Sequence, residues 1–240
     1  MKRKLRPWVK ALLTLFPLAG SAALVKYPTD LPQLRDPNSS MAEEYVHTQE
    51  EEPLTLEAWQ KINPRVKYVL RFTDGDRYRA IPVVCTPDAA YALKHNVRGE
   101  YDTMGTVFCD PCAADPVNLV IYGHSSKTKD WCFTFLKQFR EKDYFQTHPS
   151  FLLESQAGLI PCRIISSATY DLEEETEIGW ADPNAGNTEE VVQMIKASIP
   201  YLDQRREGEV YEGGGLVTLV TCDMEKTDSR IVIQALRETG

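Results

Sequence analysis

Three residues of this chain, Cys222, His124 and Arg230, carry side chains that can do chemistry and stand at the edges of predicted strands. Cys222 closes the run Leu216–Thr221, so a buried strand would deliver its thiol to an exposed end. A free cysteine has a pKa of about 8.5 and attacks only as the thiolate, so it needs a neighbouring base or cation. Histidine can supply the base, and arginine can stabilise an oxyanion and orient a peptide carbonyl. Together the three side chains would suit nucleophilic acyl transfer.

The context of each residue also allows a structural role. His124 follows the run Asn118–Gly123, where a buried strand gives way to a polar loop, and such positions hold catalytic as well as structural histidines. Cys222 could be an inert core thiol. Arg230 follows it by eight residues (230 − 222 = 8), so a tight antiparallel connection could bring it back beside the sulfur. It could equally pair with an acidic side chain of that connection, and the pattern alone leaves these alternatives open.

Short strands bounded by turn residues would position these side chains. Val66–Phe72 and Tyr78–Cys85 flank the turn Asp74–Asp76, which is typical of a hairpin. Other apolar runs predict strands at Thr106–Cys109, Asn118–Tyr122, Phe151–Glu154, Leu159–Ser166, Leu216–Val220 and Ile231–Leu236. About eight short strands with few helices predict a mostly β barrel or sandwich.

Helical segments are predicted between some of these strands. Leu54–Ile62 should form a helix that ends before a proline, because the residue before proline is biased away from helix. Apolar side chains from Trp131 to Phe139 recur at helical spacing. Thr188–Leu202 begins with a capping pair and has one apolar face, so we expect a helix there, followed by a charged turn over Asp203–Glu209.

Residues 1–25 have the layout of a membrane-targeting signal. Basic residues crowd the first ten positions and a mostly apolar run follows, so the rest of the chain is expected outside the cytoplasm. The segment would either stay as a single-pass anchor in the cell membrane or be cleaved at its small residues. Residues 26–53 are rich in Pro, Asp, Glu and Ser and predict a linker or extended arm. The folded domain is then 54–240.

The composition argues against a nucleic-acid partner. Lys and Arg number 27 against 35 Asp and Glu, which gives a formal net charge of -8. A chain with this charge does not attract a polyanion as a whole. Its 240 residues, 42% of them hydrophobic, can bury one sizeable core.

The remaining cysteines do not predict a metal site. Cys109 and Cys112 form a CxxC pair, but a structural zinc site needs about four ligands and no second pair at ligand spacing exists. We expect this pair to be a local disulfide or two inert thiols. Cys85, Cys132 and Cys162 lie in or beside apolar stretches, where cysteine usually behaves as a small hydrophobe. No cofactor is predicted.

The motifs around the three reactive residues resemble those of the sortase family. Asn118–His124 is similar to the sortase strand-histidine motif, Thr218–Cys222 to the TLxTC motif, and Arg230–Ile233 to the arginine strand. Class B is the most similar class, because its members also carry a helix before the cysteine strand, here Thr188–Leu202. The resemblance implies a closed eight-stranded sortase-type β-barrel with short helices over 54–240.

Carried over residue by residue, the resemblance implies a cysteine transpeptidase. Cys222 would cleave the C-terminal sorting signal of surface proteins and form a thioacyl intermediate. His124 would act as general acid for the leaving amine and as base for the incoming one, and Arg230 would hold the oxyanion and the signal peptide. The acceptor would be an amine of a cell-wall precursor or of another protein.

The resemblance has departures, and two other functions fit the same residues. Val220 stands where many class B members have serine, and residues 125–130 differ from the commoner continuation after the histidine. A related thiol hydrolase would pass the acyl group to water. A catalytically silent sortase-like domain would only bind peptides.

Overall fold

The computed structural model describes residues 45–48, 53–75, 77–110, 116–130, 132–171, 193, 196, 202–206, 215–226 and 228–238. The predicted membrane segment, 1–25, and one cysteine of the CxxC pair, Cys112, lie outside the described residues. Within these ranges no helix has both the length and the apolar character needed to cross a membrane.

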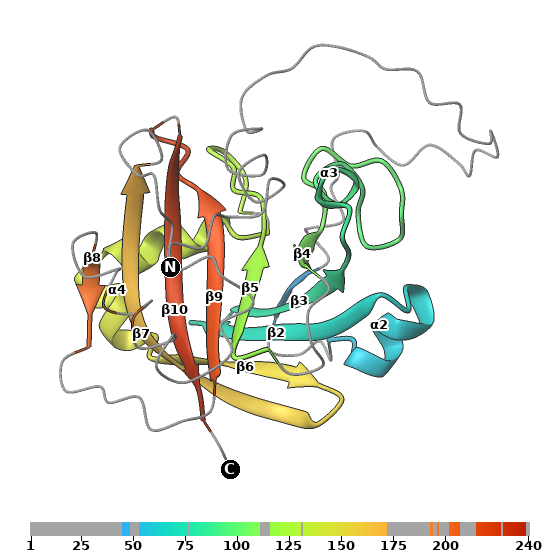
Figure 1. Ribbon diagram of the computed structural model, residues 1–240, viewed down its shortest axis with the longest axis horizontal. Coiled ribbons are helices and arrows are strands. Elements are labelled where there is room, and N and C mark those ends of the chain that lie inside the picture. The colour runs from blue at the N-terminus through green and yellow to red at the C-terminus, as the bar shows by residue number, and fades with distance from the viewer. Residues whose placement is uncertain are drawn as a thin grey trace.

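The described residues form one sheet of ten strands, most of which close into a barrel. The strands are β1 (Val46–Thr48), β2 (Val66–Asp74), β3 (Arg77–Cys85), β4 (Val107–Cys109), β5 (Asn118–Tyr122), β6 (Ser150–Ser155), β7 (Gly158–Asp171), β8 (Leu202–Arg205), β9 (Gly215–Cys222) and β10 (Ser229–Arg237). Eight of them follow the order β3-β2-β6-β7-β10-β9-β5-β4, and the pairing of β4 with β3 closes the ring (Figure 1). β1 and β8 are additions to the edges of β3 and β7. The prediction of a mostly β, closed eight-stranded barrel is confirmed.

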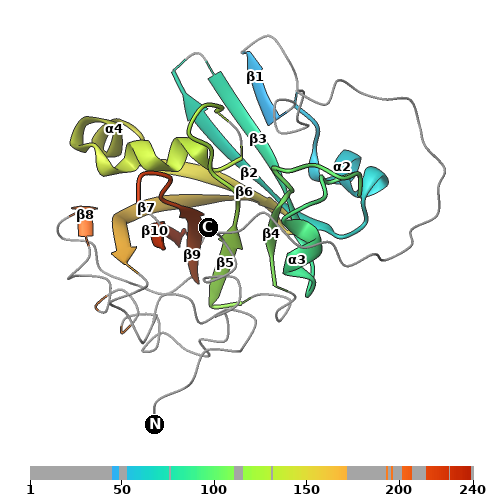
Figure 2. The same cartoon turned by 90° about the horizontal axis from the view of Figure 1, so that it is seen from above.

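A few short helices accompany the barrel. The α-helices are α2 (Leu56–Ile62), α3 (Ala89–Ala92) and α4 (Lys142–Thr147), and η2 (Thr134–Arg140) is a 3-10 helix. Thr55 caps the N-terminus of α2, where its hydroxyl accepts a hydrogen bond from the Ala58 amide, and Asn63 caps the C-terminus, so the helix ends before the proline as predicted. The helix predicted from the apolar spacing between Trp131 and Phe139 is the 3-10 helix η2. In Figure 2, α4 lies beside β7, and α2 and α3 lie on the opposite side of the barrel.

The predicted hairpin of β2 and β3 is confirmed. Asp74 pairs with Arg77 at its tip, and Gly75 between them has a positive φ of 58°, which glycine adopts without steric cost. β7 extends beyond the predicted Ser166 to Asp171. Its second half pairs with β10, so tertiary hydrogen bonds prolong the strand past the end of its apolar run.

The predicted end of the helix Thr188–Leu202 and the predicted start of the charged turn at Asp203 are wrong. Residues 193 and 196 are helical, but Leu202 already begins β8, which continues through Arg205. β8 pairs antiparallel with β7, where Ala168 lies opposite Leu202 and Ser166 opposite Arg205. The free edge of β7 supplies hydrogen-bond partners that local propensity does not encode.

The described part of the predicted arm packs on the barrel. β1 pairs with β3, so that Val46 lies opposite Arg79. Tyr45 beside it is buried and meets Trp59 of α2 edge-on, with ring centroids 6.0 Å apart. An extended segment of the chain therefore lies along β3, and the domain boundary at 53/54 stays a prediction.

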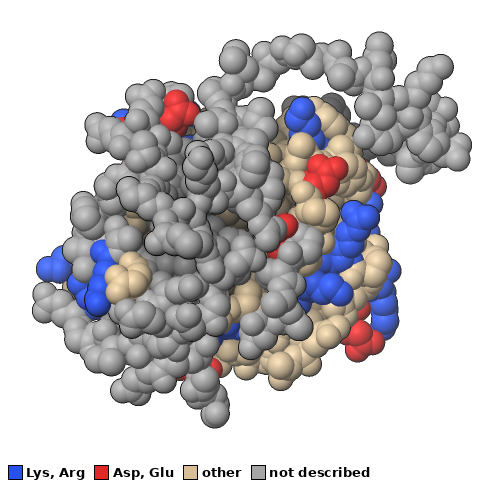
Figure 3. All heavy atoms as spheres, in the orientation of Figure 1, with Lys and Arg blue, Asp and Glu red and all other residues tan. Residues whose placement is uncertain are grey.

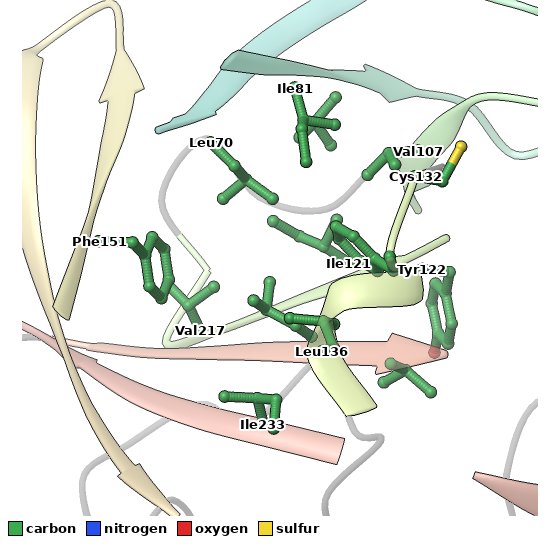
Figure 4. Packing of buried hydrophobic residues seen from close by; sticks show 14 of the residues in the cluster. Leu70, Ile81, Val107, Ile121, Tyr122, Cys132, Leu136, Phe151, Val217 and Ile233 are labelled. Carbon is green, nitrogen blue, oxygen red and sulfur yellow. The ribbon is translucent and has the colours of Figure 1, made fainter. Parts of the chain in front are cut away.

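The hydrophobic core fills the barrel. Leu70, Ile81, Ile121, Val217 and Ile233 come from five different strands and converge on its axis (Figure 4). Each such buried aliphatic side chain stabilises the fold by roughly 1.5–3 kcal/mol relative to exposure. On the described part of the surface in Figure 3, basic and acidic side chains are interleaved.

Candidate active site

β9 delivers Cys222 to one end of the barrel. Every residue of β9 is buried, because the strand lies between β10 and β5 and is covered on both faces. Cys222 is its last residue and is 6% exposed. As predicted, a buried strand ends at Cys222. The sequence suggested an exposed strand end, whereas Cys222 is buried.

Arg230 lies directly opposite Cys222. The two residues are register partners in the antiparallel β9–β10 ladder, so their side chains share one face of the sheet. The Asp223 amide donates to the Ser229 carbonyl at 3.0 Å and closes the connection just beyond this pair. Arg230 is 4% exposed, and its Nη1 donates to the same carbonyl at 2.8 Å. Arg230 is thus a buried arginine on the strand next to that of Cys222.

His124 reaches the same end of the barrel from the other side of β9. β5 runs parallel to β9, with Tyr122 opposite Val220, so His124 and Cys222 each lie two residues beyond one register pair. The Gly123 amide donates to the Val220 carbonyl at 3.1 Å, and the Thr221 hydroxyl donates to the Gly123 carbonyl at 2.8 Å. These bonds fix the backbone that carries His124 against the strand that carries the thiol.

His124 is held by one contact of its side chain and one of its backbone. Its Nε2 lies 3.0 Å from the Leu93 carbonyl, which follows α3. Its own carbonyl accepts a hydrogen bond from the Phe133 amide at 2.9 Å. A ring nitrogen that donates to a carbonyl fixes the tautomer and the orientation of the imidazole. The carbonyl of Leu93 has no sequence signal, because any residue could supply it.

Burial sets the protonation states of the pair. It raises the pKa of the Cys222 thiol to about 11, although the nearby Arg230 guanidinium opposes this and the Asp223 carboxylate adds to it. Burial also lowers the pKa of His124, against the effects of the Leu93 carbonyl and Asp102. At neutral pH the thiol is therefore protonated and the imidazole neutral, so the thiol proton must leave during attack and the imidazole is able to accept it.

An acidic and basic cluster that the sequence did not reveal lies just beyond the nucleophile. Arg140, the last residue of η2, places Nη1 3.0 Å from Oδ2 of Asp223 and Nη2 3.3 Å from Glu225. The Gln204 side chain of β8 donates to the Arg140 carbonyl at 2.8 Å. η2, β8 and the β9–β10 connection thus meet behind Cys222.

The loop after His124 is tied to the barrel wall. Asp130 accepts from Nη2 of Arg79 at 2.7 Å and from Arg77 at 3.3 Å. Arg79 is 2% exposed, and its guanidinium lies over the Phe135 ring at 4.6 Å from the centroid. The Ser126 amide donates to the Thr134 hydroxyl at 2.9 Å. The loop that differs from the commoner sortase sequence is therefore held at both ends.

The other four described cysteines are Cys85, Cys109, Cys132 and Cys162. Cys132 and Cys162 have buried thiols whose pKa burial raises to about 12, so they stay protonated, as expected of inert core cysteines. Cys85 and Cys109 are register partners on β3 and β4. Across the described ranges, no group of three or more His, Cys, Asp or Glu side chains could hold a metal ion.

The chain is similar in sequence to a known sortase. No protein-family model matches it. Sortase B of Listeria monocytogenes is 30% identical over 161 residues, which cover 64% of this chain and 62% of the relative. The chain therefore spans less than two thirds of the length of this relative.

Solved structures share the barrel. Sortase B of Clostridium perfringens matches with a TM-score of 0.67 at 22% identity, over 76% of this chain and 99% of that one. A class B sortase of Streptococcus pyogenes, described as involved in pilus biogenesis, matches with a TM-score of 0.63 at 23% identity, over 78% and 100%. The fold is that of a class B sortase.

The resemblance to class B sortases inferred from the motifs is thus confirmed in both sequence and fold. For Listeria monocytogenes sortase B the structural match has a TM-score of 0.61 at 24% identity, over 74% of this chain and 97% of that one. The sequence similarity and the fold similarity thus point to the same group of proteins. The roles of His124, Cys222 and Arg230 in this chain stay predictions.

Proposed function

We propose that this chain is a class B sortase-type transpeptidase with Cys222 as nucleophile, His124 as general acid and base, and Arg230 as oxyanion donor. The observation that supports this most strongly is the register pair of Cys222 and Arg230, together with the hydrogen bonds that hold Gly123, the residue before His124, against β9. A thiol, an imidazole and a guanidinium can supply the nucleophile, the proton transfer and the oxyanion stabilisation that acyl transfer through a thioester uses.

The proposed reaction has two halves. In the first, the Cys222 sulfur attacks the carbonyl carbon of a peptide bond in a sorting signal, and its proton passes to His124. His124 then protonates the leaving amine as the carbon–nitrogen bond breaks and the thioester forms. In the second, an incoming amine gives its proton to His124 and attacks the thioester, which releases the thiol. The Arg230 guanidinium would stabilise both oxyanions, a contribution of roughly 2.7–4 kcal/mol for one donor.

The proposed partners follow from the same reaction. The acyl donors would be surface proteins that carry a C-terminal sorting signal, and the acceptor a cell-wall precursor or another protein with a free amine. One matched structure is a Staphylococcus aureus sortase B–substrate complex, with a TM-score of 0.65 at 17% identity over 83% of this chain and 89% of that one. We place the protein at the cell membrane, with residues 1–25 as anchor and the barrel on the extracytoplasmic face.

Mass spectrometry of the purified protein, incubated with a panel of sorting-signal peptides, tests the proposal. We expect a covalent acyl adduct on Cys222 that disappears when a primary amine such as a glycine tripeptide is added and amide product forms. Cys222→Ala should give no adduct, and Cys162→Ala, which removes a buried thiol on β7, should react as the unmodified chain does. His124→Ala and Arg230→Ala should lower turnover at least 100-fold.

The alternatives give different outcomes in this experiment. A thiol hydrolase would yield only the free acid, whatever the amine concentration. A silent domain would bind a peptide without forming an adduct, and alkylation of Cys222 would leave that binding intact.

Protease treatment of intact cells tests the proposed location. We expect the protease to cleave the barrel from outside the cell, and protection of the barrel would contradict the proposal.

A further inference from the structure

Cys85 and Cys109 lie side by side at the seam that closes the barrel. β3 and β4 pair in parallel over three register pairs, and Cys85 with Cys109 is the last of them. Each cysteine is also the last residue of its strand. Register partners on parallel strands point their side chains to the same face, so both sulfur atoms leave the sheet in one direction.

We infer that Cys85 and Cys109 form a reversible disulfide that staples the barrel closed under oxidising conditions. Neighbouring strands lie about 4.7–4.9 Å apart, within the 4.4–6.8 Å range of Cα separations in disulfides. Because both strands end at this pair, their backbones can make the small adjustment that brings the two Cβ atoms into bonding range. The pairing differs from the expected CxxC disulfide between Cys109 and Cys112. This inference does not depend on the proposed function.

The exposure of the two residues suggests the order in which their thiols react with a small disulfide. Cys85 is half-buried, whereas Cys109 is buried. The Cys85 thiolate would attack a small disulfide such as oxidised glutathione, form a mixed disulfide and release one glutathione thiol. The Cys109 thiolate would then attack the Cys85 sulfur and release the second. Two protein thiols lose two electrons and two protons in total, and one glutathione disulfide is reduced to two thiols.

The position of the pair gives the disulfide a structural consequence. The β3–β4 pairing is short, yet it joins the two ends of the eight-stranded ring. The cross-link would enclose the chain between Cys85 and Cys109 (109 − 85 = 24), which includes α3 and Leu93, the carbonyl partner of His124. A ring of this length should raise the midpoint of thermal unfolding by about 5–10 °C.

Peptide mapping of the full chain in glutathione redox buffers tests the inference, with Cys222→Ala as background so that this thiol does not react. We expect a Cys85–Cys109 linked peptide in oxidising buffer, a higher unfolding midpoint, and loss of both on addition of dithiothreitol. Cys85→Ser should abolish the link and the shift. Cys112→Ser and Cys162→Ser should keep them.

Three results would overturn the inference. A Cys109–Cys112 link would restore the expected CxxC disulfide. A glutathione adduct on Cys85 without a cross-link would show that Cys109 cannot reach it. Recovery of both thiols unmodified, at glutathione ratios that oxidise a control dithiol peptide, would show that the seam does not form a disulfide.

Discussion

The Arg140 guanidinium and the Asp223 carboxylate form an ion pair of 3.0 Å directly behind Cys222. Asp223 is buried, and its negative charge contributes to the raised pKa of the neighbouring thiol. Arg140 comes from the end of η2, far from Cys222 in sequence, and offsets that charge. The ion pair therefore reduces, without abolishing, the extent to which the Asp223 carboxylate opposes formation of the thiolate.

Arg140→Ala should leave Asp223 without this partner. We expect the pH midpoint of Cys222 alkylation by iodoacetamide to move to higher pH, because an uncompensated carboxylate disfavours the thiolate. We also expect the free energy of unfolding to fall by about 1–3 kcal/mol, since a buried carboxylate loses a charged hydrogen bond. Alkylation rates across pH and urea unfolding measure the two effects.

Two further variants make the Arg140 test specific. Adding Asp223→Asn to Arg140→Ala should return the alkylation midpoint toward its original value, because the unbalanced charge is gone. Arg163→Ala, which breaks the more exposed pair with Glu238, is the matched control and should change neither quantity appreciably. An unchanged midpoint in Arg140→Ala would mean that the ion pair has no influence on the thiol.

The thiol of Cys222 should respond to pH as a buried group. Burial raises its pKa to about 11, so its alkylation rate should keep rising well above pH 9, whereas that of a short cysteine peptide levels off near its pKa of about 8.5. Arg230 lowers the pKa, so Arg230→Met should shift the profile further upward at similar side-chain volume. A profile that levels off near pH 8.5 would show that the thiol is solvated.

Arg79 and Arg77 contact the same carboxylate from very different environments. Both bond to Asp130, but the side chain of Arg79 is 2% exposed and that of Arg77 is 63% exposed. Arg79→Met should lower the free energy of unfolding by about 1–3 kcal/mol, because it removes a charged hydrogen bond of a buried guanidinium and its stacking on Phe135. Arg77→Met should cost less than about 1 kcal/mol. Equal losses in urea unfolding would refute the role assigned to burial.

Gly123 leaves no space for a side chain. A Cβ there would lie 2.8 Å from two Phe133 ring carbons and 3.1 Å from Val107 Cγ2. Gly123→Ala should therefore destabilise the fold by about 1–3 kcal/mol and displace the backbone that carries His124. The double variant Gly123→Ala with Phe133→Leu should recover part of this loss in thermal unfolding. Full stability of Gly123→Ala alone would mean that the ring moves without cost.

The sequence predicts where the strands of the barrel lie along the chain better than it predicts which strands pair with each other. Asn118–Tyr122 is a strand with the predicted bounds, because a buried apolar run is bounded by polar or turn residues on both sides. The parallel closure of β3 on β4 has no local signal, since apolar periodicity does not specify which strand lies alongside. β8 is misassigned for the same reason: its hydrogen bonds come from β7.

The sequence indicates which side chains to expect at the candidate site, but it does not indicate the groups that surround them. Cys222, His124 and Arg230 stand at strand edges, and the structure brings their strands together in register. Arg140 ends an apolar helical segment, and nothing in its neighbourhood distinguishes it from a solvated arginine. The Leu93 carbonyl is a backbone group, so its contact with His124 depends on tertiary structure alone.

β9 pairs with β10 along its whole length and with β5 from Leu216 to Val220, and all of its residues are buried, Cys222 included. Amide protons in such a strand exchange only when the whole barrel opens, so fraying of surface loops does not reorient the thiol. Heat inactivation of the protein should consequently coincide with global melting, and storage conditions that preserve the barrel should also preserve the reactive end of this strand.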